Sequence, residues 1–232
     1  DTDALLAGVS SRRRGAWTPN KAWPKQQDWI ALDVLESCYG GAAGGGKTDA
    51  LLASALRFAD TPGYAALILR RTFPDLALPG AIMDRSHAWL DGTRARWNGQ
   101  EKCWIFPSGA KLQFGYCDSK EDLQRYKSAE FAFIGIDELT EWPETWATFL
   151  FSRLRRLAGS VVPLRFRAAT NPDGLGAPWV RERYGLPEGK VIEEPIWKTS
   201  NRVFWPARAD DNPSIDLPAY ERSLEAMAGG RD

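Results

Sequence analysis

Eight consecutive residues of this 232-residue chain follow the pattern G-x-x-x-x-G-K-[ST], which cradles the phosphates of a nucleotide. Glycines let the backbone turn tightly, so that successive N–H groups point inward at an anion. The lysine brings a positive charge to the β- and γ-phosphates, and the last hydroxyl is a ligand for Mg²⁺. The residues that we predict to bind the phosphates are Gly41, Ala42, Ala43, Gly44, Gly45, Gly46, Lys47 and Thr48, with Lys47 also catalytic and Thr48 also on the metal.

The sequence around this loop supports a phosphate site over a chance glycine-rich turn. An amphipathic run over residues 50–58 predicts a helix from Thr48 to about Asp60, whose N-terminal dipole would face the phosphates. A short apolar stretch at 37–39 predicts a strand just before the loop. A strand, a glycine-rich turn and a helix, in that order, are what the pattern requires.

A second element that a phosphate loop needs is found where the apolar run 131–136 ends in Asp137 and Glu138. A carboxylate at a strand end can hold Mg²⁺, which we assign to Asp137. The next carboxylate can polarise an attacking water as a general base, which we assign to Glu138. By itself, this pattern would also fit a strand that ends in two solvent-exposed acids with no catalytic role. The order of the motifs, and the strand predicted at 65–70 between them, favour hydrolysis over a kinase or a GTPase switch.

A third apolar run, 163–169, ends in Thr170 and Asn171, followed by Pro172. Asn-Pro by itself indicates a turn. In third position after the two phosphate-site motifs, however, these polar side chains favour a sensor or coupling role beside the γ-phosphate.

Strands that alternate with helices predict an α/β fold with a mainly parallel central sheet. Three short strands at 94–97, 103–106 and 110–116, separated by turns, predict a β-hairpin insertion. We expect an N-terminal arm at 1–24, an ATPase core at 25–172 and a small, less regular lid and linker region at 173–232. The further helices that we predict lie at 24–35, 74–90 with a break at Pro79-Gly80, 119–127 and 143–157.

Composition narrows the function further. The chain has 30 Lys and Arg against 30 Asp and Glu, so any grip on nucleic acid must be local. Three widely spaced cysteines and one histidine argue against a disulfide framework, a metal centre or histidine catalysis. No run of 18 apolar residues is present, so the sequence predicts no membrane span.

Taken in order, these motifs resemble the ATPase domain of the large terminase subunit, the DNA-packaging motor of tailed bacteriophages and related viruses. The resemblance covers about residues 20–228. Its most specific parts are Arg-Arg-Thr-Phe-Pro at 70–74, Ala-Glu-Phe leading to Asp-Glu at 129–138, and Thr-Asn-Pro at 170–172. It also includes Pro24-Lys25-Gln26, Ser152-Arg153-Leu154-Arg155, Phe204-Trp205-Pro206-Ala207, Asp211-Asn212-Pro213 and Tyr220.

The resemblance implies a P-loop NTPase fold of the additional-strand, catalytic-glutamate class. It implies ATP and Mg²⁺ as cofactors, and hydrolysis that drives double-stranded DNA into a procapsid. Its implied partners are that DNA, the portal protein, the small terminase subunit and further copies of the chain in a ring, with a monomer expected in isolation. The implied location is the host cytoplasm of a virus-encoded protein, with no membrane.

The resemblance also implies roles for single residues. Gln26 would read the adenine edge, with Gln27 as its rival, and Thr170 with Asn171 would couple hydrolysis to movement. An arginine from a neighbouring subunit would complete each site, with Arg125 as first candidate and Arg153 and Arg70 as alternatives. A patch that could face DNA or a neighbour comprises Arg153, Arg155, Arg156, Arg165 and Arg167.

Two other functions fit part of the sequence. One is another nucleic-acid ATPase, of helicase or recombinase type, although strand-separating helicases carry two such cores and this chain has one phosphate loop. The other is a nucleotide-binding module without turnover. Full-length large terminases continue into a nuclease domain. We expect this chain to stop in the linker near 227–230 and to have no nuclease activity.

Overall fold

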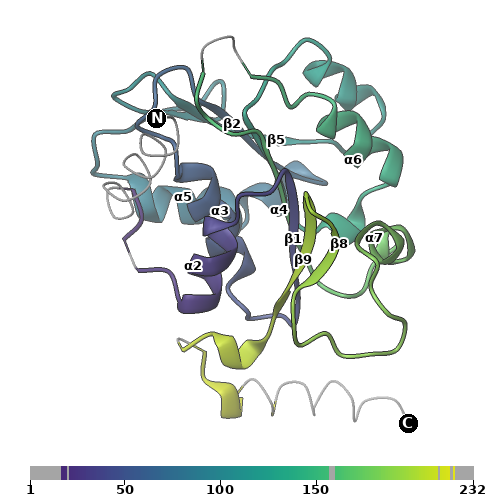
Figure 1. The fold of residues 1–232 in the computed structure, drawn as a ribbon. Helices are drawn as coiled ribbons and strands as arrows, with labels where there is room; N and C mark the ends of the chain where they lie inside the picture. Colours follow the sequence, from purple (N-terminus) through teal and green to yellow (C-terminus); the bar gives the residue numbers. More distant parts are fainter. Residues whose placement is uncertain (1–16, 20, 157–159, 214, 220–221, 223–232) are drawn as a thin grey trace.

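The computed structural model describes residues 17–19, 21–156, 160–213, 215–219 and 222 (Figure 1). Most of the predicted arm at 1–24, the end of the predicted lid and linker region, and Tyr220 lie outside the described residues. The division into arm, core and lid region therefore stays a prediction.

Within the described residues, nine strands form one sheet in the order β3-β4-β5-β2-β6-β7-β1-β9-β8. The parallel strands are β1 (Glu36–Gly41), β2 (Ala65–Arg70), β5 (Lys111–Tyr116), β6 (Phe133–Ile136), β7 (Arg165–Thr170) and β9 (Arg202–Ala207). Antiparallel strands close the two edges: β3 (Arg96–Asn98) and β4 (Cys103–Ile105) on one side, β8 (Ile196–Thr199) on the other. The predicted α/β class, the mainly parallel sheet and the hairpin insertion are confirmed.

The strand that separates the two phosphate-site strands in the sheet is β7. It pairs with β6 through Ile134 and Phe166, and with β1 through Cys38 and Ala168. Strand β2, which lies between the two motifs in the sequence, pairs instead on the far side of β6. The additional strand is therefore the one that ends in Thr170, and chain order alone suggests the wrong strand.

Helices cover both faces of the sheet, each over its own apolar cluster (Figure 1). On one face lie α2 (Pro24–Ala31), α3 (Lys47–Leu56), α4 (Phe73–Ala77) and α5 (Ile82–Leu90). On the other lie η1 (Glu121–Tyr126), η2 (Leu139–Glu141), α6 (Glu144–Phe151) and α7 (Ala177–Tyr184). The short helix η3 (Ala209–Asp211) follows β9. Among the described residues, no helix has the length and apolar character needed to cross a membrane.

Several predicted elements differ from the structure. The predicted helix 119–127 is the 3₁₀-helix η1, and the predicted helix 143–157 ends at Phe151. The sequence predicts little regular structure after 172, yet this region contributes α7, β8 and β9. Sequence patterns do not predict β9, because the run at 202–207 contains Pro206, which argues against a strand.

Two members of the predicted arginine patch are buried, so that prediction is wrong for Arg165 and Arg167. Their side chains leave β7 on one face and are 3% and 0% exposed. The Arg167 guanidinium donates to the carbonyl oxygens of Leu32 and Val34, each at 3.0 Å. Burial lowers the pKa of Arg165 to about 10, and burial also lowers the pKa of Arg167 well below its usual value. These arginines therefore stabilise the turn between α2 and β1 and do not face DNA or a neighbouring subunit.

Candidate functional site

The predicted site groups meet at one edge of the sheet, where the parallel strands end; we call it the C-terminal rim. Strand β1 runs into the phosphate loop, β6 into Asp137 and Glu138, and β7 into Thr170 and Asn171. Strand β2 ends there with Arg70. Ligands in open α/β sheets bind outside the carboxyl ends of the strands, so this rim is the expected place for a nucleotide.

The loop from 41 to 46 has a shape that only glycine allows at its main bends. Gly41 has φ 139°, and a Cβ there would lie 2.1 Å from the carbonyl oxygen of Ala207. Gly46 has φ 67°, and a Cβ there would meet the ring of Trp23 at 2.4 Å. Backbone N–H groups in such turns can converge on an anion. The loop therefore has the glycine-lined shape that a phosphate-binding loop requires.

Lys47 begins α3 and is 7% exposed. Its ammonium group donates to the carbonyl oxygens of Ala42 at 2.5 Å and Gly41 at 3.3 Å, so it crosses the opening of the loop. Burial lowers the pKa of Lys47, while the charges of Glu138 and Asp137 oppose that shift. One positive charge thus lies between the loop and the two carboxylates.

Asp137 is 3% exposed, and its carboxylate faces Arg70, whose Nε lies 3.3 Å from Oδ2. Arg70 also lies 3.6 Å from Glu138 Oε1, and it donates to the carbonyl oxygen of Asp75 at 3.3 Å. Arg70 therefore acts on the carboxylates of its own chain. This position does not suit an arginine that must reach a neighbouring subunit's site.

Glu138 has a left-handed backbone, with φ 53° and ψ 61°, which is uncommon for a residue other than glycine. Strain of this kind is concentrated at functional sites. Its carboxylate accepts two hydrogen bonds from Asn171 Nδ2, at 3.1 and 3.2 Å, and one from the Asn171 backbone N–H at 3.3 Å. The structure thus brings the predicted base and a predicted coupling residue into direct contact.

Thr170 contacts the segment that follows the carboxylates. Its hydroxyl accepts from the N–H of Thr140 at 3.1 Å and lies 2.9 Å from the Thr140 hydroxyl. Thr140 in turn donates to the carbonyl oxygen of Asp173 at 2.6 Å. Hydrogen bonds therefore join the end of β7 to the start of η2.

The residues of the rim suit ATP and Mg²⁺. Among the described residues, no group of three or more His, Cys, Asp or Glu could hold a metal alone. Mg²⁺ usually needs only one or two protein ligands beside phosphate oxygens and water, which Asp137 and the Thr48 hydroxyl can supply. Asn171 Oδ1 is buried and has no partner in the described structure, an acceptor that the hydrogen of a bound water would satisfy.

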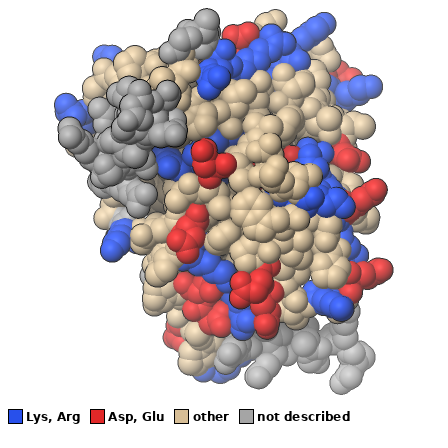
Figure 2. Space-filling view, in the orientation of Figure 1, with Lys and Arg blue, Asp and Glu red and all other residues tan. Residues whose placement is uncertain are grey.

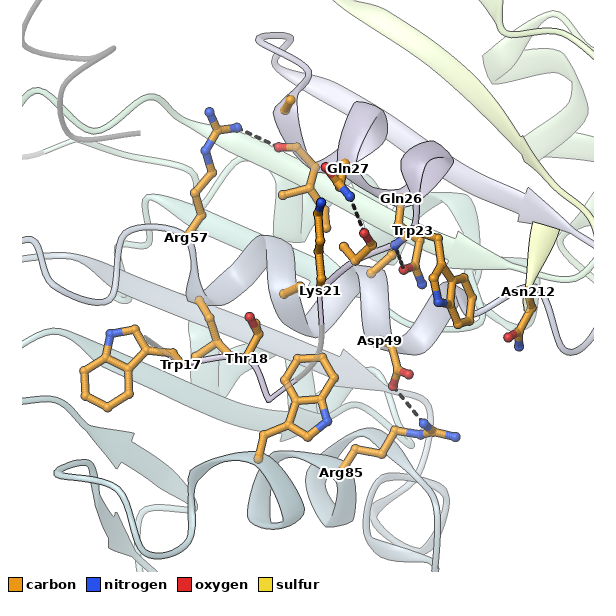
Figure 3. A pocket seen from close by; sticks show the side chains of 17 residues that line it. Trp17, Thr18, Lys21, Trp23, Gln26, Gln27, Asp49, Arg57, Arg85 and Asn212 are labelled. Carbon is orange, nitrogen blue, oxygen red and sulfur yellow. Dashed lines mark hydrogen bonds and ion pairs between the residues drawn. The ribbon is translucent and has the colours of Figure 1, made fainter. Parts of the chain in front are cut away.

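A cavity of about 810 Å³ lies beside the loop, between α2, α3 and α5 (Figure 3). Gln26 and Gln27 both line it. The Gln26 side chain accepts from the Trp23 N–H at 3.0 Å and donates to the carbonyl of Gly46 at 2.8 Å. Gln27 donates to the carbonyl of Ala22. Gln26 thus contacts the loop directly, and its second amide hydrogen and second oxygen lone pair remain for a base.

The three arginine candidates lie in different places. Arg125 in η1 is 54% exposed and pairs with Asp122 at 2.7 Å, with its guanidinium 5.0 Å from the Tyr116 ring centre. Arg153 donates to the carbonyl of Lys127 and lies near the opposite edge of the sheet. Arg125 is therefore the candidate that is both exposed and outside its own chain's carboxylate cluster.

Sequence reasoning misses several groups around the loop. It suggests Arg70 only as a residue acting on a neighbour, although Arg70 ends a strand next to the one that carries Asp137. Asn212 Nδ2 donates to the Gly44 carbonyl at 2.6 Å, and Lys25 pairs with Asp211 at 2.8 Å. Both contacts join segments more than 160 residues apart, so no local sequence signal predicts them.

The Asp137 carboxyl gives a prediction about pH. Burial raises its pKa from 3.8 to about 6, against the opposing charge of Arg70. The folded state then binds the proton more tightly than the unfolded state. The stability of the wild type relative to Asp137→Asn should therefore fall as pH rises from about 4 to 7, by up to about 3 kcal/mol.

Urea unfolding of both proteins in EDTA across that range measures the difference directly. Because all other titrating groups are shared, a difference that stays flat with pH would contradict the raised pKa of Asp137.

Comparisons with known proteins bear on the family and the fold of the chain. The family model described as terminase large subunit, T4likevirus-type, N-terminal, matches residues 38–159. A sequence comparison with curated proteins finds no match.

Solved structures share the fold. One is the large terminase of a thermophilic bacteriophage in complex with ATP-gamma-S (TM-score 0.64, 16% identity, 88% of this chain and 49% of that chain). Another is the large terminase ATPase domain of Thermus phage P74-26 (0.62, 14%, 93% and 92%). A third is the N-terminal domain of the DNA packaging ATPase from bacteriophage phi29 (0.59, 14%, 82% and 97%).

This chain spans about half the length of the thermophilic phage's large terminase in the structures that it matches. At such low identities, the structural likeness establishes the fold, which is the P-loop NTPase fold of terminase ATPase domains. The family model matches more than half of the 232 residues. The chain therefore belongs to the terminase large subunit family.

Proposed function

We propose that the chain hydrolyses ATP with Mg²⁺ at the C-terminal rim. The observation that carries this proposal is the contact of Glu138 with Asn171, beside the buried Asp137 and Lys47 at the opening of a glycine cradle. A loop that only binds phosphate does not need a second carboxylate on a strained backbone beside the first.

Each residue then has a task that follows from its position. ATP with Mg²⁺ supplies the γ-phosphate as the group to be transferred to water. The N–H groups of the loop and Lys47 would hold the phosphates, and Asp137 with Thr48 would hold the metal. Glu138 removes the proton of the attacking water. Gln26 reads the base in the neighbouring cavity with the amide hydrogen and the oxygen lone pair that its bonds to Gly46 and Trp23 leave over.

Asn171 is suited to report the state of the site to the rest of the chain. Its side chain bonds both oxygens of Glu138, while its neighbour Thr170 is bonded to Thr140. When Glu138 turns toward a bound nucleotide, it must give up the Asn171 contacts. Loss of these contacts changes the bonding of Asn171 while Thr170 stays bonded to Thr140, and this link from the site to η2 supports the coupling role of Thr170 and Asn171.

We further propose that this hydrolysis moves double-stranded DNA into a procapsid. Family membership supports this, and so does the fold shared with a DNA packaging ATPase. The partners would be the duplex, the portal protein, the small terminase subunit and further copies of the chain in a ring. Such a virus-encoded motor works in the host cytoplasm.

Turnover should depend on protein concentration. Arg125 is exposed and lies outside its own carboxylate cluster, so we propose that it completes a neighbour's site. An arginine acting on another subunit can raise the rate by about 10³–10⁵. Phosphate release per molecule should therefore be slow when dilute, rise as the protein is concentrated, and stay low for Arg125→Ala.

Arg96→Ala is the matched control. Arg96 is also exposed, but it lies at the start of β3, at the end of the sheet away from the C-terminal rim. If the Arg125→Ala protein gains activity with concentration as the wild type does, Arg125 is not the completing residue. Turnover that is fast in dilute wild type would contradict the need for a neighbour.

A further inference from the structure

The parallel strands begin at the end of the sheet opposite the nucleotide site, and this end carries many exposed cations. Strands β2, β5 and β6 begin there, as does β3, and the segment 153–155 pairs with Phe131 just before β6. Figure 2 shows Lys and Arg side chains gathered along the upper edge of the molecule, in the orientation of Figure 1. The basic rim, as we call it, consists of Arg94, Arg96, Lys111, Lys127, Arg153, Arg155 and Arg156.

Few carboxylates balance this rim. Glu130 pairs with Arg155 at 3.3 Å, and Glu101 pairs with Lys111 at 3.7 Å. The cations Arg94, Arg96, Lys127 and Arg156 are exposed and form no ion pair with the residues that the structure describes. Because the formal charge of the chain is zero, this excess reflects segregation of charge. A positive edge on a neutral protein is available for an anionic partner.

The rim cations form two groups on a firm support. Arg94 and Arg96 lie at the start of β3, and the others, apart from Lys111, lie near the start of β6. Four strand intervals separate β3 from β6 in the sheet, which at about 4.8 Å each places the groups roughly 19 Å apart. That span exceeds the major groove, about 12 Å wide, so the groups can reach the backbones on either side of a groove.

Aromatic side chains at this edge are turned inward. Phe106 and Phe131 are buried, and Trp97 is half-buried against His87 and Trp104. Proteins that grip single strands stack bases on exposed aromatic rings. In the described part of the chain, the rim offers charge without such rings, which favours a duplex backbone over unpaired bases.

We propose that the basic rim binds the phosphate backbone of double-stranded DNA, independently of sequence. The choice of duplex DNA as partner rests on the proposed packaging function. The geometry also relates the two sites, because β6 has the rim at its start and Asp137 with Glu138 at its end. From Phe131 to Asp137 is six residues, about 20 Å of strand. One short strand thus joins the duplex surface to the catalytic carboxylates.

Fluorescence anisotropy with a short labelled duplex tests this proposal. The first variant combines Arg94→Glu with Arg96→Glu, and the second combines Lys127→Glu with Arg156→Glu. The control combines Lys190→Glu with Lys198→Glu, two exposed cations that form no ion pair within the described residues; Lys198 lies on β8, four strand intervals from β6. All three double variants change the net charge equally, so only the location differs.

Each rim variant should bind the duplex more weakly, and its slope of log K against log salt should shrink by about 2, because each lost phosphate contact removes about 0.9. The control should keep the wild-type slope. Equal losses in control and rim variants would overturn the proposal. It would also be overturned if polyglutamate competed as well as duplex DNA, since the rim would then fit an acidic protein.

Nucleotide binding and ATP turnover on the same proteins separate the two proposals. The rim variants should retain both, because no rim residue touches the nucleotide site. If the wild type turns over ATP but does not bind the duplex, the proposed role of the basic rim is overturned and the proposed ATPase activity stands. Wild type that binds duplex through the rim but not ATP supports the rim and overturns the proposed function.

Discussion

Replacing Glu138 by glutamine should reduce ATP turnover by about 10²–10⁴-fold, the usual contribution of a positioned general base. Nucleotide affinity should change little, because the loop and Lys47 hold the phosphates without Glu138. The glutamine keeps the size of the side chain and an oxygen for Asn171, which bonds Glu138 at 3.1 Å. Steady-state phosphate release and binding of a fluorescent ATP analogue measure the two effects separately.

Glu141→Gln is the matched control. Glu141 lies three residues further along, and burial raises its pKa, with Arg70 opposing the shift, so it also senses the site. It does not contact Asn171 in the described hydrogen bonds, and its removal should leave turnover near the wild-type value. If the Glu138 and Glu141 variants lose the same activity, turnover needs negative charge at the C-terminal rim in general. The assignment of Glu138 as the single base is then wrong.

Replacing Lys47 by methionine should nearly abolish nucleotide binding. Methionine keeps an apolar stem in the buried position but removes the ammonium group that crosses the loop. Losing one partner of a buried, hydrogen-bonded charge pair costs about 2–5 kcal/mol, roughly a 30- to 5,000-fold rise in Kd. Calorimetric titration with the Mg²⁺ complex of a non-hydrolysed ATP analogue measures this affinity.

Lys198→Met is the control, since Lys198 is exposed on β8 beside the start of β9, at the opposite end of the strands from the loop. The unfolding temperature should be compared too, because Lys47 also bonds the carbonyls of Ala42 and Gly41. A Lys47 variant that is folded and binds the analogue normally would show that the loop does not hold the phosphates.

Much of this site follows from the sequence, because its groups sit at strand ends with strong local patterns. Residues 41–48 fix their own conformation through glycine, and the apolar runs before Asp137 and Thr170 predict buried strands. Parallel strands bring their carboxyl ends to one edge, so the meeting of these motifs was predictable. Glu138 and Asn171 are in contact because they follow the carboxyl ends of β6 and β7, which are parallel neighbours.

The parts that could not be predicted depend on long-range pairing or on burial. The order of strands put β7, not β2, beside β1, and no local pattern encodes that choice. Arg165 and Arg167 resembled surface cations, yet carbonyl oxygens of α2 and of the turn before β1 accept hydrogen bonds from them in the interior. Arg70 became part of its own chain's site because the ends of β2 and β6 are neighbours. In each case, the surroundings of the strand or side chain depend on a segment that is distant in the sequence.

Phosphate release from ATP by the concentrated wild-type chain, with Mg²⁺ and with EDTA, tests the central claim most directly. The account predicts steady turnover with Mg²⁺, none with EDTA, and a rate for Glu138→Gln near the background. If the chain binds the Mg²⁺ complex of ATP tightly and still releases no phosphate at any concentration, it is a nucleotide-binding module, and the catalytic role of the C-terminal rim is contradicted.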